Sequence, residues 1–130
     1  MPKKSKTPDI EWLAQPEDHD YPAAASYLNL TYHDDIVAKV EAALRQAPMK
    51  TFKAKDIFRA SHLSLLGVSN SHVQKNIKKI KKGIPLSPVL LVRDARNGIC
   101  IIADGYHRVC GVYHFNEDAD IPCQIADLPA

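Results

Sequence analysis

Two short apolar runs joined by a turn constrain the fold of this chain most strongly. The first run spans residues 89–92 and the second spans residues 99–103. The polar residues between them end in Asn97-Gly98, a dipeptide typical of the tight turns that connect antiparallel strands. Because both runs have the length of a buried strand, the pattern predicts a β-hairpin within a small sheet.

Helical patterns lie on both sides of this hairpin. Apolar residues recur at helical spacing along residues 71–82, and Gly83 then provides a stop signal. A second helix is expected directly after the hairpin, over residues 106–115. The remaining expected elements are helices over 23–28, 34–45 and 54–60 and a strand over 121–125. Helices, a hairpin, a helix and a final strand together predict an α+β fold.

Length and composition exclude several classes of protein. The 130 residues suffice for one domain. No apolar run approaches the roughly 18 residues of a membrane span, and the basic start lacks the apolar segment of a secretory signal. Three cysteines, an odd number without a close pair, argue against a disulfide scaffold and a structural zinc site. We therefore expect a cytoplasmic protein with no membrane contact.

Charge is distributed unevenly along the chain. The net charge of +2 hides a basic block over residues 50–82, where nine Lys and Arg residues stand against a single acid, Asp56. Such a block favours an anionic partner, either the phosphates of a nucleotide or a nucleic acid backbone. A solvated helix face would carry the same charges, so the block by itself leaves these interpretations open.

The turn at residues 103–108 is the candidate site. Gly105 can adopt a positive φ or admit a ligand close to the backbone, and the free amides of the following helix favour an anion. His107 and Arg108 add donor side chains beside those amides. Asp104 could orient His107 or hold a metal that bridges phosphates. Alternatively, Asp104 only caps the helix and the other side chains are surface groups.

The segment from about residue 55 to residue 125 resembles the ParB N-terminal and sulfiredoxin superfamily. The resemblance is carried by the basic helix ending at Gly83, the Leu-Ser-Pro start of the hairpin at 86–88, the box at 104–108 and the Ile-Pro pair at 121–122. In this superfamily the box and the preceding helix bind nucleotide phosphates. The ligand is CTP in ParB, ATP in sulfiredoxin and ADP in a related serine kinase, whose box is among the most similar.

This resemblance implies an organisation for the whole chain. A ParB/sulfiredoxin-like domain, with a small mixed sheet and flanking helices, would occupy residues 54–130. A helical extension over residues 21–53 would precede it, after a mobile tail over residues 1–20. The extension could cover the site as a lid or form the contact of a homodimer.

The resemblance also assigns roles to residues of the basic helix. His72 and Lys75 match the helix start that contacts phosphate in sulfiredoxin, and Lys79 lies one turn further on the same face. The kinase-like branch uses a carboxylate as catalytic base, for which Asp104 and Asp56 are the candidates, with His107 beside them.

One position departs from sulfiredoxin. Tyr106 stands where sulfiredoxin carries its reactive cysteine, which argues against sulfinic acid reductase activity.

Two classes of function follow. The first is a nucleotide-binding enzyme, a phosphotransferase or hydrolase that acts on ATP, ADP or CTP with Mg²⁺. The second is a non-catalytic module in which nucleotide binding, or contact of the basic helix at 71–82 with DNA, regulates assembly. Because no DNA-reading helix pair follows the last strand, nucleic acid contact is expected to be weak and sensitive to salt.

Overall fold

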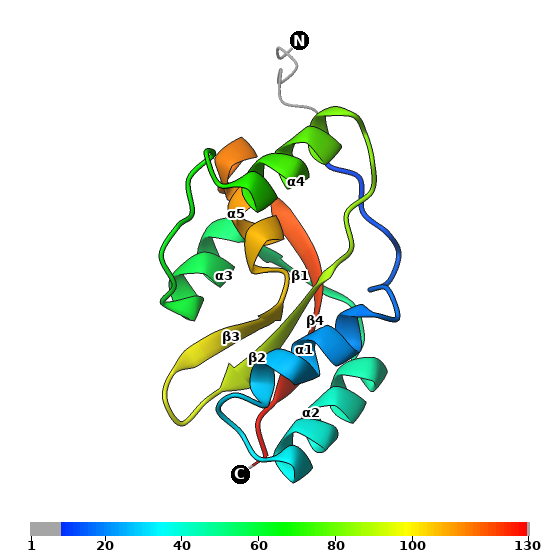
Figure 1. Ribbon diagram of the computed structural model, residues 1–130, viewed down its shortest axis with the longest axis vertical. Helices are drawn as coiled ribbons and strands as arrows, with labels where there is room; N and C mark the ends of the chain where they lie inside the picture. The colour runs from blue at the N-terminus through cyan, green and yellow to red at the C-terminus, as the bar shows by residue number, and fades with distance from the viewer. Residues whose placement is uncertain (1–8, 130) are drawn as a thin grey trace.

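The computed structural model describes residues 9–129 and is shown in Figure 1. Within these residues the chain forms five helices and an open, four-stranded mixed sheet. The helices are α1 (Asp20–Leu28), α2 (Asp34–Gln46), α3 (Ala54–Ser61), α4 (Ser71–Lys81) and α5 (Tyr106–Phe115). The strands are β1 (Lys50–Lys53), β2 (Val89–Asp94), β3 (Ile99–Asp104) and β4 (Asp120–Asp127). The α+β class expected from the sequence is confirmed.

The sheet has the strand order β1-β4-β2-β3. The predicted hairpin is present, because β2 and β3 pair antiparallel across the Asn97-Gly98 turn. From β3 the chain passes through α5 and returns as β4, which pairs parallel to β2. Strand β1 pairs antiparallel to the other side of β4 and forms an edge of the sheet. The box at 104–108 thus joins edge strand β3 to α5.

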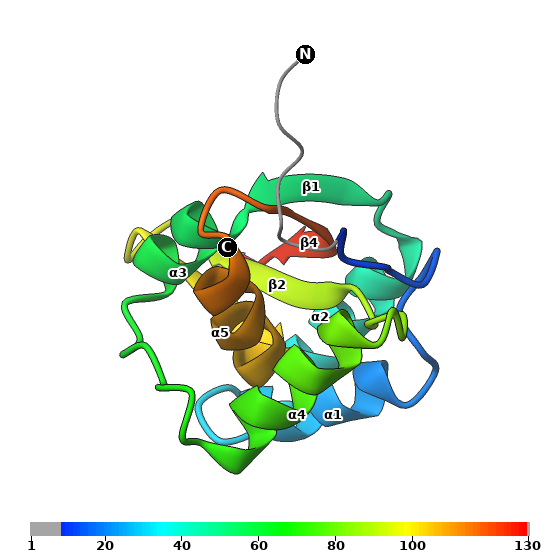
Figure 2. The same cartoon turned by 90° about the horizontal axis from the view of Figure 1, so that it is seen from above.

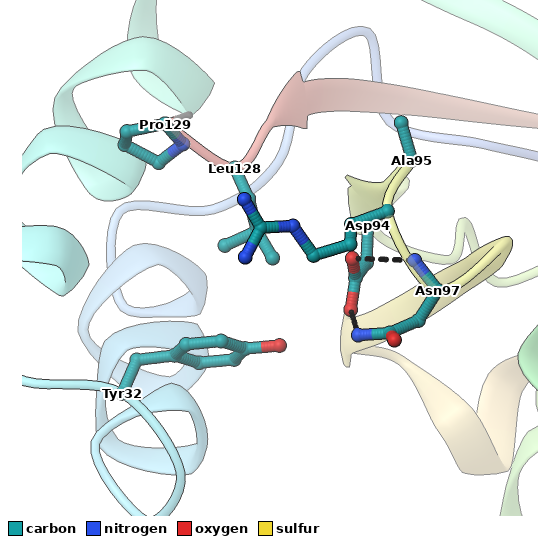
Figure 3. A pocket seen from close by; sticks show the side chains of 7 residues that line it. Tyr32, Asp94, Ala95, Asn97, Leu128 and Pro129 are labelled. Carbon is teal, nitrogen blue, oxygen red and sulfur yellow. Dashed lines mark hydrogen bonds between the residues drawn. The ribbon is translucent and has the colours of Figure 1, made fainter.

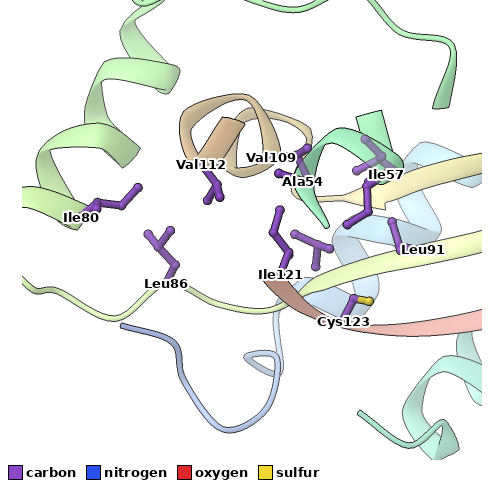
Figure 4. Close-up of a cluster of buried hydrophobic side chains, with 11 residues drawn as sticks. Ala54, Ile57, Ile80, Leu86, Leu91, Val109, Val112, Ile121 and Cys123 are labelled. Carbon is purple, nitrogen blue, oxygen red and sulfur yellow. The ribbon is translucent and has the colours of Figure 1, made fainter. Parts of the chain in front are cut away.

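Both faces of β2 are buried, so its side chains alternate between two hydrophobic clusters. Val89 and Leu91 face the first cluster, together with residues from α3, α4 and α5, as Figure 4 shows for Leu91. Leu90 and Val92 face the second cluster, together with α1 and α2. Figure 1 accordingly shows α1 and α2 on one side of the sheet and the other three helices on the opposite side.

The segment before β1 packs on the sheet and is also attached to it by hydrogen bonds. The hydroxyl of Tyr21 donates a hydrogen bond of 2.6 Å to Gln124 Oε1 on β4. Before α1, Trp12 forms a parallel bridge with Leu86, just ahead of β2. Of the mobile tail expected over residues 1–20, the part from residue 11 onward is therefore attached to the segment before β2. Residues 1–8 lie outside the part of the chain that the structure describes.

Strand β1 was not expected from the sequence, which predicted only helices before residue 54. Its four residues carry no alternating apolar pattern, and only Phe52 is partly buried. Pairing with β4, where Phe52 lies opposite Ile121, makes this segment a strand. None of the helices between residues 9 and 129 is long and apolar enough to cross a membrane.

Candidate functional site

The candidate site is built on the sharp turn between β3 and α5. Gly105 occupies this turn with φ of 115°, a backbone conformation that residues other than glycine rarely adopt. A Cβ atom at this position would also lie 2.5 Å from Val89 Cγ1 and 3.0 Å from Arg108 Nη2. Glycine is therefore needed both for the backbone conformation and for the close approach of β2 and α5.

Because glycine is the N-cap, the first turn of α5 has no side-chain cap. Its amides also lack partners within the helix, and the helix dipole adds a partial positive charge there. The start of α4 differs, because Asn70 Oδ1 accepts hydrogen bonds from the amides of His72 and Val73 at 2.9 and 3.2 Å. The first turn of α5 thus retains amide donors for a ligand.

A hollow of about 210 Å³ lies at this helix start, between α4 and α5. Figure 2 shows the two helices side by side. The lining residues come from α4 and from the box and are His72, Lys75, Asn76, Asp104, Gly105, Tyr106, His107 and Arg108. Two segments that the sequence assigned to phosphate binding, about 30 positions apart, therefore meet at one place.

Two histidines from different helices face each other across the hollow. The ring centroids of His72 and His107 are 4.8 Å apart. Burial and the neighbouring His72 together lower the pKa of His107. A neutral imidazole can donate one hydrogen bond, and a bound anion would favour its protonation. Tyr106 lies beside His107 and donates its hydroxyl hydrogen bond to the Ser64 carbonyl, away from the histidine pair.

The structure pairs Asp104 with Arg108. Arg108 Nη2 donates hydrogen bonds to Asp104 Oδ2 at 2.8 Å and to the Pro88 carbonyl at 3.3 Å. Both side chains of the ion pair are less than one-fifth exposed. The Nε of Arg108 is buried and has no hydrogen-bond partner in the described part of the chain. The guanidinium is therefore held at the hollow by two acceptors that share one of its nitrogens, Nη2.

Asp104 does not fit the expected role of a metal ligand in this arrangement. Burial raises its pKa, the charge and hydrogen bond of Arg108 oppose this, and the nearby Asp20 raises it further. A magnesium ion prefers an octahedron of ionised oxygen ligands and water. Here the single lining carboxylate already binds a guanidinium, which the ion would have to displace. Glu17, His19 and Asp20 have ligand atoms within 4.8 Å of one another, but such groups are common without a metal.

Two of the sequence candidates lie outside the hollow. Asp56 is an exposed residue of α3, 3.7 Å from Arg59, and it lines a different hollow together with Phe52. Lys79 is partly buried on α4 and does not line the site. Of the two candidate bases, the structure therefore places only Asp104 beside His107 and Arg108.

Three residues around the site were missed by sequence reasoning. Asn76 is nearly buried between α4 and α5, and its position among the apolar residues Val73 and Ile80 was a usable signal. Asp20 and Ser87 are buried polar residues that contact each other, yet they are 67 positions apart. No local pattern in the sequence relates such distant residues.

A larger hollow of about 420 Å³ lies at the opposite end of β3, between the hairpin turn and Tyr32, as shown in Figure 3. Asp94 there accepts hydrogen bonds from the backbone and side-chain nitrogens of Asn97 at 3.2 and 2.8 Å. The carboxylate thus stabilises the turn itself. No helix N-terminus and no predicted site residue lines this hollow, so its size alone indicates no chemistry.

Comparisons of the chain with models of known families, with curated proteins and with solved structures found no match. The resemblance to the ParB and sulfiredoxin superfamily therefore rests on the motifs in the sequence.

Proposed function

We propose that this protein binds the phosphates of a nucleotide in the hollow between α4 and α5. The observation that supports the proposal is the meeting of Lys75, His107 and Arg108 at the uncapped start of α5. Helix amides and a guanidinium are the groups that proteins commonly use to hold phosphate oxygens. The volume of about 210 Å³ fits a phosphate chain better than a whole nucleotide, so the nucleoside would extend outward.

Each lining group has a separate part in this proposal. The free amides of α5 donate to one phosphate, and Gly105 leaves room for that phosphate near the backbone. Arg108 supplies a charged donor in a fixed orientation, and Lys75 supplies a mobile positive charge at the rim. His72 and His107 add hydrogen-bond donors on either side of the phosphate.

We propose a ParB/sulfiredoxin-like fold for the segment that contains this site. The mixed sheet, the helix at 71–81 and the Gly-Tyr-His-Arg turn are consistent with the order of motifs in that superfamily. ATP, ADP and CTP are therefore the nucleotides to test first. Any Mg²⁺ would be carried by the phosphates, because Asp104 is engaged by Arg108.

The geometry supports binding more directly than phosphoryl transfer or hydrolysis. Charge neutralisation and positioning are most of what phosphoryl transfer requires, and the cationic lining supplies both. A catalytic base must also reach the nucleophile. The carboxylate in the hollow, Asp104, is bound to Arg108 and would have to exchange that partner first.

A thermal-shift titration with ATP, ADP and CTP, each with and without Mg²⁺, tests the proposal. At least one nucleotide should raise the melting temperature in a concentration-dependent way. Arg108→Ala should abolish this shift and Lys75→Ala should weaken it. The matched control is Arg96→Ala, because Arg96 lies on the hairpin turn at the other hollow. No stabilisation at concentrations well above micromolar would contradict the proposal.

Weak nucleic acid binding through α4 is a second candidate. The observation that favours it is that none of the α4 lysines forms an ion pair within residues 9–129. Three of them, Lys75, Lys78 and Lys81, are exposed, and so is Lys82 just past the helix. If DNA is the partner, retention on DNA should fall steeply with salt and be unaffected by Arg108→Ala. Dependence on Arg108 would instead indicate the hollow.

A further inference from the structure

The N-terminal segment reaches the site through a buried carboxylate at the start of α1. Asp20 is only 3% exposed, although it is a charged residue in the first turn of a helix. Burying a carboxylate is unfavourable unless hydrogen bonds compensate it. The helix start alone does not explain this burial, because the helix dipole also stabilises an acid that is exposed.

The partners of Asp20 lead directly to the candidate site. Its Oδ2 accepts a hydrogen bond from the amide of Glu17 at 2.9 Å and another from the hydroxyl of Ser87. Asp20 is also close enough to Asp104 to raise the pKa of the Asp104 carboxyl group. Asp104 accepts a hydrogen bond from Arg108 Nη2. The same nitrogen also donates to the carbonyl of Pro88, the residue after Ser87. The series of contacts runs from Asp20 through Ser87 and Pro88 to the guanidinium in the hollow.

The backbone secures the same connection. The amide of Leu13 donates to the Leu86 carbonyl at 2.8 Å, and the amide of Leu86 donates to the Glu11 carbonyl at 2.9 Å. The amide of Glu17 lies 3.3 Å from the Ser87 hydroxyl oxygen. The segment that supplies Ser87 and the Pro88 carbonyl is therefore held in place by residues 11–20.

We propose that Asp20 and Ser87 are positioning residues that hold the Pro88 carbonyl, and through it Arg108, in the orientation that receives a phosphate. This inference rests on the proposed function. It makes the N-terminal segment a working part of the site.

The physical reason is that Arg108 alone does not determine its own orientation. A guanidinium is planar, and a small rotation about its side chain redirects every donor. Two fixed acceptors, the Asp104 carboxylate and the Pro88 carbonyl, remove this freedom. The Pro88 carbonyl is held from the N-terminal side, so loosening Asp20 or Ser87 should let the guanidinium move.

Two substitutions test the proposal. Asp20→Asn keeps the shape of the side chain and removes its charge. Ser87→Ala removes a single hydroxyl and serves as the milder variant if Asp20→Asn folds poorly. The matched control is Asp18→Asn, which makes the same change at an exposed residue two positions earlier. Circular dichroism establishes that each variant is folded.

The first readout is the NMR signal of the Arg108 Nε–H group, which requires no nucleotide. This group is buried and should exchange slowly in the wild-type protein. We expect its signal to shift or broaden in Asp20→Asn and Ser87→Ala and to stay unchanged in Asp18→Asn. An unchanged signal in both variants would overturn the proposal, whether or not the protein binds nucleotides.

The second readout is nucleotide affinity, measured by calorimetry in a double-mutant cycle with Arg108→Lys. Asp20→Asn should weaken binding at least fivefold in the wild-type background and have little effect in the Arg108→Lys background. An equal loss in both backgrounds would show a general structural role and contradict positioning. If the wild-type protein binds no nucleotide, the proposed function fails. The Arg108 Nε–H signal alone then decides whether Asp20 and Ser87 position Arg108.

Discussion

At the scale of single residues, the backbone geometry of the site depends on Gly105. Its positive φ was anticipated from the sequence, because a glycine between a strand and a helix is typical of such turns. Its close contact with Val89 was not anticipated, because the two residues approach each other only after the sheet forms.

Gly105→Ala should therefore destabilise the protein. Alanine would be strained at φ of 115° and would clash with Val89 Cγ1 at 2.5 Å. The strain alone costs about 1–3 kcal/mol, and the clash adds to it. Urea unfolding measures the loss. The control is Gly83→Ala, where φ is 72° but no atom lies within 4 Å, so the strain is present without the clash. Equal losses at both positions would contradict the packing argument.

His107 makes stability depend on pH. Its pKa in the folded protein is lowered by burial and by His72, below the value of about 6.5 expected in the unfolded chain. A group with a lowered pKa contributes fully above the unfolded pKa and loses this contribution as pH falls through the folded pKa. Relative to His107→Gln, the wild type should lose stability below about pH 6.5.

Urea unfolding of both proteins at a series of pH values measures this difference. Saturating nucleotide should reduce it, because a phosphate stabilises the protonated imidazole. Parallel stability curves for the two proteins, with no divergence on the acid side, would show that His107 is not in the environment described.

At the scale of elements, the hairpin and all five helices were predictable because each carries its own local signal in the sequence. Helix α5 begins and ends at the predicted residues, and α4 ends one residue earlier than predicted. Strand β1 was missed because its residues are mostly exposed and it is defined by pairing with β4. The network of Asp20 and Ser87 was missed for the same reason, since its members are joined by tertiary structure alone.

The packing of α4 against α5 sets the width of the hollow. A Cβ atom at Gly111 of α5 would lie 3.1 Å from Asn76 Cβ of α4. Gly111→Leu should push the helices apart, destabilise the protein by about 1–3 kcal/mol and weaken nucleotide binding. Gly111→Ala is the graded control, because its single carbon requires a shift of only a few tenths of an ångström and alanine favours the helix. Thermal melting and nucleotide titration of both variants check this, and an unchanged Leu variant would contradict it.

At the scale of the whole molecule, the N-terminal helices and the sheet share a core. Leu44 of α2 is fully buried in the cluster that includes Leu90 and Val92 of β2. The alternate side chains of β2, Val89 and Leu91, belong to the other cluster. Because β2 joins the two clusters, we expect the N-terminal helices and the rest of the molecule to unfold together. Residues on both sides of position 54, where the sequence divided the chain, contribute to this one cluster.

Leu44→Ala should destabilise the whole molecule by about 2–5 kcal/mol while unfolding remains a single transition. Urea unfolding followed by circular dichroism and by Trp12 fluorescence should give coincident curves. The control is Leu30→Ala, because Leu30 is 81% exposed and its loss should change stability by less than about 0.5 kcal/mol. Separate transitions for the two probes would indicate independently folding parts.

The central claim is that nucleotide phosphates bind at the start of α5. Its most direct test is a ¹H–¹⁵N NMR titration of the full chain with ATP, ADP or CTP. We expect the largest shifts at the backbone amides of Tyr106, His107 and Arg108, with smaller shifts near His72 and Lys75. An absence of shifts with every nucleotide, or shifts confined to the lysines at the end of α4, would contradict the claim.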